Sequence, residues 1–95
     1  MIRLVANFHF KQENVEEAIK LAKELVEKSR MEKGCAHYNL AQSTESSQQI
    51  VFLEAWETKA ALDAHSASEH FVRIVPALKE MCEKTPVLQS YVQLI

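Results

Sequence analysis

Residues 2–10 alternate between large apolar and more polar side chains, and this period of two predicts a β-strand. The two faces of that strand carry Ile2, Leu4, Ala6, Phe8 and Phe10 on one side, and Arg3, Val5, Asn7 and His9 on the other. The apolar spacing then becomes that of an amphipathic helix, with a stripe of Val15, Ala18, Ile19, Ala22, Leu25, Val26 and Ser29. Asn14, with Glu17 three residues later, is expected to cap this helix as a capping box.

Gly34 is the only glycine and follows this helix, where a left-handed residue is expected at a helix end. The next residues predict two strands, 35–42 and 50–56, which are joined by the polar loop STESSQ. A short helix is expected to start after Thr58 as its cap and to run through His65.

A third helix follows, with Ser66 or Ser68 as its expected cap. Its buried stripe is predicted to be Phe71, Ile74, Val75, Leu78 and Cys82. Pro76 lies inside this pattern, and because proline lacks a backbone donor we expect the helix to kink or restart there. Pro86 opens a last strand, 87–95.

The order of elements, β-α-β-β-α-β, predicts an α+β fold of the ferredoxin-like class. In that arrangement one domain, residues 1–95, forms a four-stranded antiparallel sheet with the helices on one face. Short connections and the right-handed crossover rule leave few other topologies. The first and third strands are expected at the centre of the sheet.

Those two central strands carry apolar residues on both faces, whereas two helices can cover only one face of the sheet. A large exposed apolar face usually marks an interface. We therefore predict a homodimer in which two sheets pack face to face. In this interpretation Phe8 and Phe10 face the partner, and Val5, Asn7 and His9 face the helices.

The balance of charge excludes some classes of partner. The chain has 11 basic and 13 acidic residues and a formal net charge of −2, so no basic surface for nucleic acid or anionic membrane is expected. Cys35 and Cys82 lie far apart, which favours free thiols in a cytoplasmic protein, although one disulfide stays open. The first residues are too short and polar for a signal peptide or membrane span.

Polar residues beneath the helices would need partners. An unpaired buried polar group costs about 1–3 kcal/mol, so Asn7 and His9 either bond within the protein or line a cavity. His65 is the leading candidate for a catalytic base, because it follows Ala61 and Leu62 at inward-facing spacing and histidine titrates near neutral pH. A structural histidine bonded to a carbonyl fits the same spacing.

Three other side chains have both a plain and a functional interpretation. On the plain interpretation, Trp56 and Tyr38 are core rings and His70 is exposed. On the functional interpretation, these three residues line a binding site together with Phe71 and His9. No metal site is expected, since His65 and His70 are five residues apart and no HExxH or Cys/His cluster exists. A serine nucleophile is not expected either, because GxSxG is absent.

Three stretches resemble the antibiotic biosynthesis monooxygenase family, small dimeric α+β barrels that include quinol monooxygenases. They are MIRLVANFHF, the Gly34–Cys35 turn followed by Tyr38, and EAWETKAALDAHSASEHF at 54–71. The resemblance implies a homodimer and a pocket between sheet and helices, lined by Asn7, His9, Trp56, His65, His70 and Phe71. Some similar proteins degrade haem with an Asn and a His; here Asn7 matches, but Val75 stands at the second position, which disfavours haem.

The resemblance favours a monooxygenase that oxidises an electron-rich aromatic, such as a quinol or anthrone, with O2 and no cofactor. In that hypothesis His65 removes a phenolic proton, Asn7 stabilises the anion, and Trp56 and Phe71 hold the ring. His65→Ala is then expected to abolish oxygen uptake while leaving the fold intact. A binding module without catalysis and an isomerase of a phosphorylated keto-sugar, held by Arg3 and Arg73, are the alternatives.

Overall fold

The computed structural model describes all residues 1–95 and contains four strands and three α-helices. The strands are β1 (Ile2–His9), β2 (Cys35–Gln42), β3 (Gln49–Trp56) and β4 (Val87–Val92). The helices are α1 (Val15–Arg30), α2 (Lys59–Ser66) and α3 (Glu69–Glu80), and a 3-10 turn, Gln12–Asn14, precedes α1. The last strand is therefore shorter than the predicted segment 87–95. No helix has the length and apolar character needed to cross a membrane.

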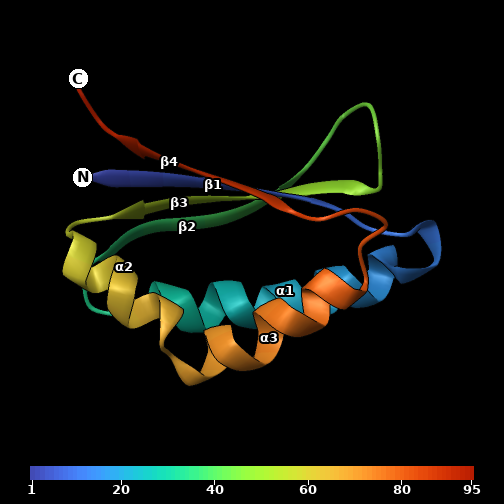
Figure 1. The fold of residues 1–95 in the computed structure, drawn as a ribbon, viewed down its shortest axis with the longest axis horizontal. Coiled ribbons are helices and arrows are strands. Elements are labelled where there is room, and N and C mark those ends of the chain that lie inside the picture. The colour runs from blue at the N-terminus through green and yellow to red at the C-terminus, as the bar shows by residue number, and fades with distance from the viewer.

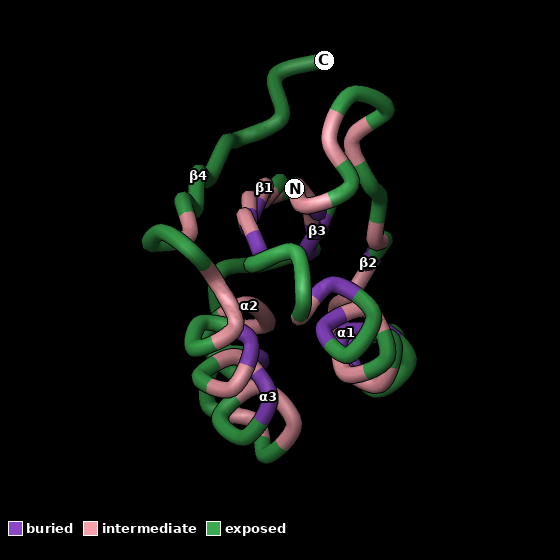
Figure 2. The backbone as a smooth tube through the Cα atoms, turned by 90° about the vertical axis from the view of Figure 1, so that its right-hand side faces the viewer, coloured by how far each residue is buried: buried purple, intermediate pink, exposed green.

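The four strands form one antiparallel sheet in the order β2-β3-β1-β4. All three helices lie on one face of it, and the opposite face carries no helix (Figure 1). The predicted ferredoxin-like α+β fold, with the first and third strands at the centre, is confirmed. Figure 2 shows β4 exposed along its length at one edge, whereas the buried segments of β1 and β3 lie in the middle.

The face of β1 that packs on the helices is the opposite of the one predicted. Ala6, Phe8 and Phe10 are buried in the core, whereas Asn7 and His9 are only partly buried. Phe8 stacks on Phe10 at 5.5 Å and meets the buried Phe52 of β3 edge to face. The aromatic set is therefore the one that the helices cover, and the prediction that Phe8 and Phe10 face a partner is wrong.

Two of the three α-helices begin with a side-chain cap from a predicted residue. Thr58 accepts a hydrogen bond from the Ala61 N–H, and Ser68 accepts one from the Phe71 N–H, so both caps are as predicted, with Ser68 in place of Ser66. Asn14 makes no side-chain cap; its Nδ2 donates to the Met81 carbonyl instead, 3.3 Å away. The preceding 3-10 turn already organises the start of α1, so a capping box is not formed.

The apolar stripe predicted for α1 is confirmed, since all of its residues except Ile19 are buried. In α3, Ile74 and Leu78 are buried, and the helix continues through Pro76 to Glu80 rather than restarting. Both cysteines are free and partly buried. Burial raises the pKa of the Cys35 thiol to about 11, so this thiol stays protonated at neutral pH.

Gly34 has a left-handed backbone, with φ of 86°, in the turn that leads from α1 into β2. It lies three residues beyond the α1 cap, Met31, and so shapes the turn rather than the helix end. A β-carbon placed on Gly34 would lie 2.5 Å from the Ala61 β-carbon in α2. Glycine is required here both by the backbone conformation and by the close approach of α2.

We expect Gly34→Ala to lower the free energy of unfolding by about 2 kcal/mol, because it adds left-handed strain to an overlap with Ala61. Urea unfolding of the purified variants measures this loss. The double variant Gly34→Ala/Ala61→Gly should recover part of it, since only the overlap is relieved. A double variant whose loss is simply the sum of the two single losses would show that the overlap contributes nothing.

Candidate active site

An apolar pocket lies between the sheet and the helices. It is a cavity of about 60 Å³ that opens to solvent, smaller than a typical small-molecule site, so an aromatic molecule would enter only as side chains at its opening move. Its walls are formed by Leu4, Ala6, Phe8, Leu25, Tyr38, Phe52, Glu54, Phe71, Val75, Lys79 and Leu88. Lys79 and Leu88 are exposed and mark the side on which the pocket opens. Nine of the eleven lining residues are hydrophobic, so the pocket suits an apolar molecule.

Glu54 places a carboxyl group in this apolar wall. The residue is only 4% exposed, and its Oε1 accepts a hydrogen bond from Trp56 Nε1 at 2.9 Å. The other carboxyl oxygen of Glu54 has no hydrogen-bond donor from the protein, and this atom is not fully buried. One carboxyl oxygen is thus fixed by Trp56, and the other is free to meet a molecule in the pocket.

Burial raises the pKa of Glu54 from 4.5 to about 7, against the opposing hydrogen bond from Trp56 and with a further contribution from the Glu32 charge. Taking a carboxylate out of water disfavours its charged form. A carboxyl group that titrates near neutral pH exchanges protons readily in both directions. This property is typical of a catalytic acid or base.

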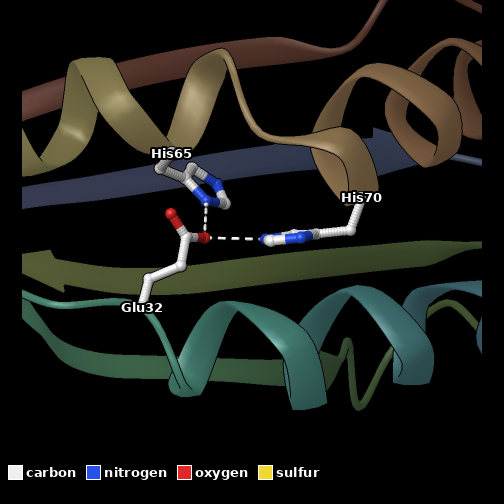
Figure 3. Close-up of side chains that lie close together, drawn as sticks. All are labelled: Glu32, His65 and His70. Atoms are coloured by element: carbon white, nitrogen blue, oxygen red, sulfur yellow. Dashed lines mark hydrogen bonds and ion pairs between the residues drawn. The ribbon is translucent and has the colours of Figure 1, made fainter.

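A cluster of three polar residues lies behind the pocket wall. His65 is 1% exposed, and its Nδ1 lies 2.6 Å from Oε2 of Glu32. His70, at the start of α3, points its Nε2 at the same oxygen from 2.8 Å (Figure 3). Glu32 comes from the turn after α1, so three separate elements meet at one carboxylate.

Aromatic rings connect this group to the pocket. The His65 ring lies 4.5 Å from that of Trp56, and Phe71 and Tyr38 lie edge-on to it at 5.1 and 5.3 Å. Burial lowers the pKa of His65, with Glu32 opposing the effect. A neutral His65 that donates from Nδ1 to Glu32 offers Nε2 as an acceptor, 3.5 Å from the Tyr38 hydroxyl.

Burial also raises the pKa of Tyr38 far above its usual 10, with the Glu54 charge adding to the effect. Its hydroxyl therefore stays protonated at neutral pH. Tyr38 lines the pocket, and its hydroxyl lies 3.5 Å from His65 Nε2, to which it donates when Nδ1 of His65 carries the imidazole proton. Tyr38 and Glu54 are directly paired across β2 and β3.

Comparison with known proteins assigns the chain to a family. The family described as "Antibiotic biosynthesis monooxygenase" matches residues 1–77. The chain belongs to the antibiotic biosynthesis monooxygenase family. A solved structure titled "Crystal structure of antibiotic biosynthesis monooxygenase" superposes with a TM-score of 0.95 at 33% identity, covering all of both chains.

Two curated relatives belong to bacteria. "Putative monooxygenase YcnE" of Bacillus subtilis is 37% identical over 81 residues, which cover 85% of this chain and 85% of that protein. "Uncharacterized protein sll1783" of Synechocystis is 29% identical over 90 residues, or 95% of this chain. This family member spans only 61% of the length of the Synechocystis protein.

The structure brings five of the seven residues predicted for the site together. Tyr38 and Phe71 line the pocket directly, whereas Trp56, His65 and His70 lie behind its wall. His65 is enclosed by Trp56, Tyr38 and Phe71, so a truncation to alanine would open a cavity and leave Glu32 without a partner. Because His65 is buried, the expectation that His65→Ala leaves the fold intact is not supported, and we expect this variant to be less stable.

Asn7 and His9 lie elsewhere. Both project from the face of β1 that no helix covers, and the Asn7 Oδ1 accepts a hydrogen bond from Gln49 Nε2 at 3.1 Å. The prediction that they lie beneath the helices is wrong, because the bulkier alternate residues of β1, such as Phe8, fill that layer. Neither residue lines the pocket in this family member.

Two acidic residues of the site escaped the sequence analysis. Glu54 had a visible signal, since it is the one charge in the apolar run IVFLEAW and shares a strand face with Trp56. Glu32 had none, because it lies in the polar turn MEKG, 33 residues before His65. Only the folding of α1 against the corner between α2 and α3 shows that it meets both histidines.

Proposed function

We propose that the protein is a monooxygenase that oxidises an electron-rich aromatic molecule, of the quinol or anthrone class, with O2. The observation that carries this proposal is the Glu54 carboxyl group, set in an otherwise apolar pocket with one oxygen free. Family membership supports the reaction class. The role that the sequence suggested for His65 passes to Glu54, because Glu54 lines the pocket and His65 does not.

In the proposed reaction the substrate supplies the electrons, so no metal or flavin takes part. Glu54 removes a proton from a hydroxyl group of the substrate, and the resulting anion gives one electron to O2. Recombination of the radical pair forms a carbon–oxygen bond, and Glu54 returns its proton to the resulting peroxide anion. Loss of the remaining hydrogen of the same carbon as a proton then breaks the O–O bond, and the hydroxide that leaves takes up that proton to form water. An anthrone CH2 thereby becomes a carbonyl, with one atom of O2 in the product and one in water.

The free-energy balance favours Glu54 as the base. A phenol has a pKa of about 10, so transfer to a group of pKa about 7 costs roughly 4 kcal/mol at 1.36 kcal/mol per unit. A hydrogen bond to a charged group is worth about 1.5–3 kcal/mol, and in this proposal the Tyr38 hydroxyl turns from His65 Nε2, 3.5 Å away, to donate to the substrate anion. His65, with a pKa below 6.5, faces a larger gap and already contacts Glu32.

The isomerase alternative finds little support in the pocket. Lys79 is the only cationic residue among the lining residues. Arg73 lies outside the pocket and pairs with Glu24 and Glu69, and Arg3 is exposed and bonds to Gln93. Haem is disfavoured as well, because no histidine lines the pocket and Val75 occupies part of its wall.

We also propose that the protein acts as a homodimer in the cytoplasm, through the sheet face without helices. The face is formed by the odd-numbered residues of β1 and their neighbours, which place Val5 beside Leu53 and Gln89. Leu53 is 38% exposed, and Tyr91 at the edge is 49% exposed. The residues that meet the partner are thus aliphatic side chains and Tyr91 rather than Phe8 and Phe10.

The experiment that tests the function is incubation of the protein with a panel of quinols and anthrones under 18O2. One labelled oxygen atom in the product, and no product under anaerobic conditions, would support the monooxygenase. Tight binding of a quinol without oxygen consumption would instead assign the pocket to a binding module. Rearrangement of a substrate without oxygen would favour an isomerase.

A further inference from the structure

We propose that Glu32, His65 and His70 form a binding site for a divalent transition-metal ion of the Zn²⁺ class. Oε2 of Glu32 lies 2.6 Å from His65 Nδ1 and 2.8 Å from His70 Nε2. All three potential ligand atoms lie within 4.8 Å of one another. Figure 3 shows the three side chains pointing toward one common position.

The donor set is one that such ions use. Two imidazoles and one carboxylate bind Zn²⁺ in many proteins, with metal–nitrogen and metal–oxygen distances of about 2.0–2.2 Å. Tetrahedral ligands at those lengths lie roughly 3.3 Å apart, as follows from the same metal–ligand distances. The two contacts to Glu32 are shorter than that, whereas the two histidine nitrogens are bounded only by the 4.8 Å limit. A shift of Glu32 by about 1 Å away from both rings, with a rotation of the partly exposed His70 toward His65, would admit the ion. Glu32 can make it, because its side chain lies in a turn and is 16% exposed.

Neither histidine needs to change its charge to become a ligand. Each imidazole can move its proton to its other ring nitrogen and present a lone pair to the ion. For His65 that other nitrogen is Nε2, which then donates toward the Tyr38 oxygen 3.5 Å away. A second partner of this kind fixes the orientation of metal-binding histidines in known sites.

The backbone around the three residues is already ordered. Ser68 Oγ donates to the His65 carbonyl at 2.7 Å and accepts from the Phe71 N–H, which fixes the corner between the two histidines. The Glu32 carbonyl accepts from the Cys35 N–H across the Gly34 turn. His70 is 14% exposed, so an ion and a water ligand can reach the site from solvent.

The site lies beside the proposed oxygenase pocket, and His65 contacts Tyr38 and Phe71 of the pocket wall. None of its three residues lines the pocket. A bound ion would link the turn after α1 to the ends of α2 and α3, and we infer that it stabilises the fold by this link. This site was not predicted from the sequence, because the spacing of His65 and His70 excludes a site on one helix but not one that is completed by Glu32.

Titration of the apo protein with Zn²⁺, followed by calorimetry and by the melting temperature, tests the proposal. We expect one ion per chain and a rise in Tm of about 10 °C at a hundredfold excess over Kd, since the ion binds only the folded state. Co²⁺ should give d–d absorption of a low-coordinate site. These readouts need no oxygen and no quinol, so they are independent of the oxygenase proposal.

Two variants locate the ion. Glu32→Gln and His70→Asn should each weaken Zn²⁺ binding at least tenfold, whereas the matched controls His9→Asn and His37→Asn, outside the cluster, should bind as the natural chain does. His70→Asn is the decisive variant if Glu32→Gln folds poorly, because His70 is partly exposed. No Zn²⁺ or Co²⁺ binding by the natural chain would overturn the proposal. Binding that survives in His70→Asn but is lost in Cys35→Ser would overturn it too.

Discussion

Glu54→Gln is expected to lower kcat for a quinol or anthrone by about 10²–10⁴-fold, the usual contribution of a positioned acid–base group. Glutamine keeps the size of the side chain and can still accept the Trp56 hydrogen bond at 2.9 Å, but it cannot take a proton. Oxygen uptake by the natural chain should rise with pH through about 7, as Glu54 ionises. That rise should be absent from the residual activity of the variant.

The matched controls separate catalysis from structure. Glu57→Gln removes an exposed carboxylate just beyond the end of β3 and should leave turnover unchanged. Tyr38→Phe keeps the aromatic ring but removes the hydroxyl donor, and a loss of about tenfold would match one hydrogen bond to an anion. Full turnover by Glu54→Gln, with its circular dichroism spectrum intact, would refute Glu54 as the base.

The contribution of Glu54 to the free energy of unfolding should fall by about 3 kcal/mol as pH rises from 4.5 to 7. The sign follows from its pKa, which is higher in the folded chain than the value of 4.5 expected after unfolding. Between the two values the folded state holds a proton that the unfolded state has released. Stability from this group is thus fully present below pH 4.5 and is lost above pH 7.

Urea unfolding at several pH values measures this effect as a difference between the natural chain and Glu54→Gln. The subtraction removes the contributions of groups that do not interact with Glu54, whereas the effect of the Glu32 charge, which adds to the raised pKa of Glu54, stays in the measured difference. Below pH 4.5 the two chains should be similar in stability, and above pH 7 the variant should be the more stable. Parallel curves across the whole range would contradict a buried, protonated Glu54.

Local patterns along the chain were enough to predict the helices and strands and their order. The stripe of α1 and the caps Thr58 and Ser68 depend on neighbours within a few residues, so the sequence alone predicts them. The alternation in β1 likewise predicts a strand, but it does not say which face meets the helices. That choice depends on the partner strand, where Phe52 packs against Phe8.

The chemistry of the site depended on contacts between distant segments. Period and composition reveal buried faces, so they were enough to predict the ferredoxin-like fold and to suggest Tyr38, Trp56, His65, His70 and Phe71 as site residues. In contrast, the place of Glu54 in the pocket wall and the contact of Glu32 with both histidines follow from how distant segments pack together. Burial sets the pKa of Glu54, and burial is produced by the whole packed layer of helices on the sheet rather than by any local run of residues.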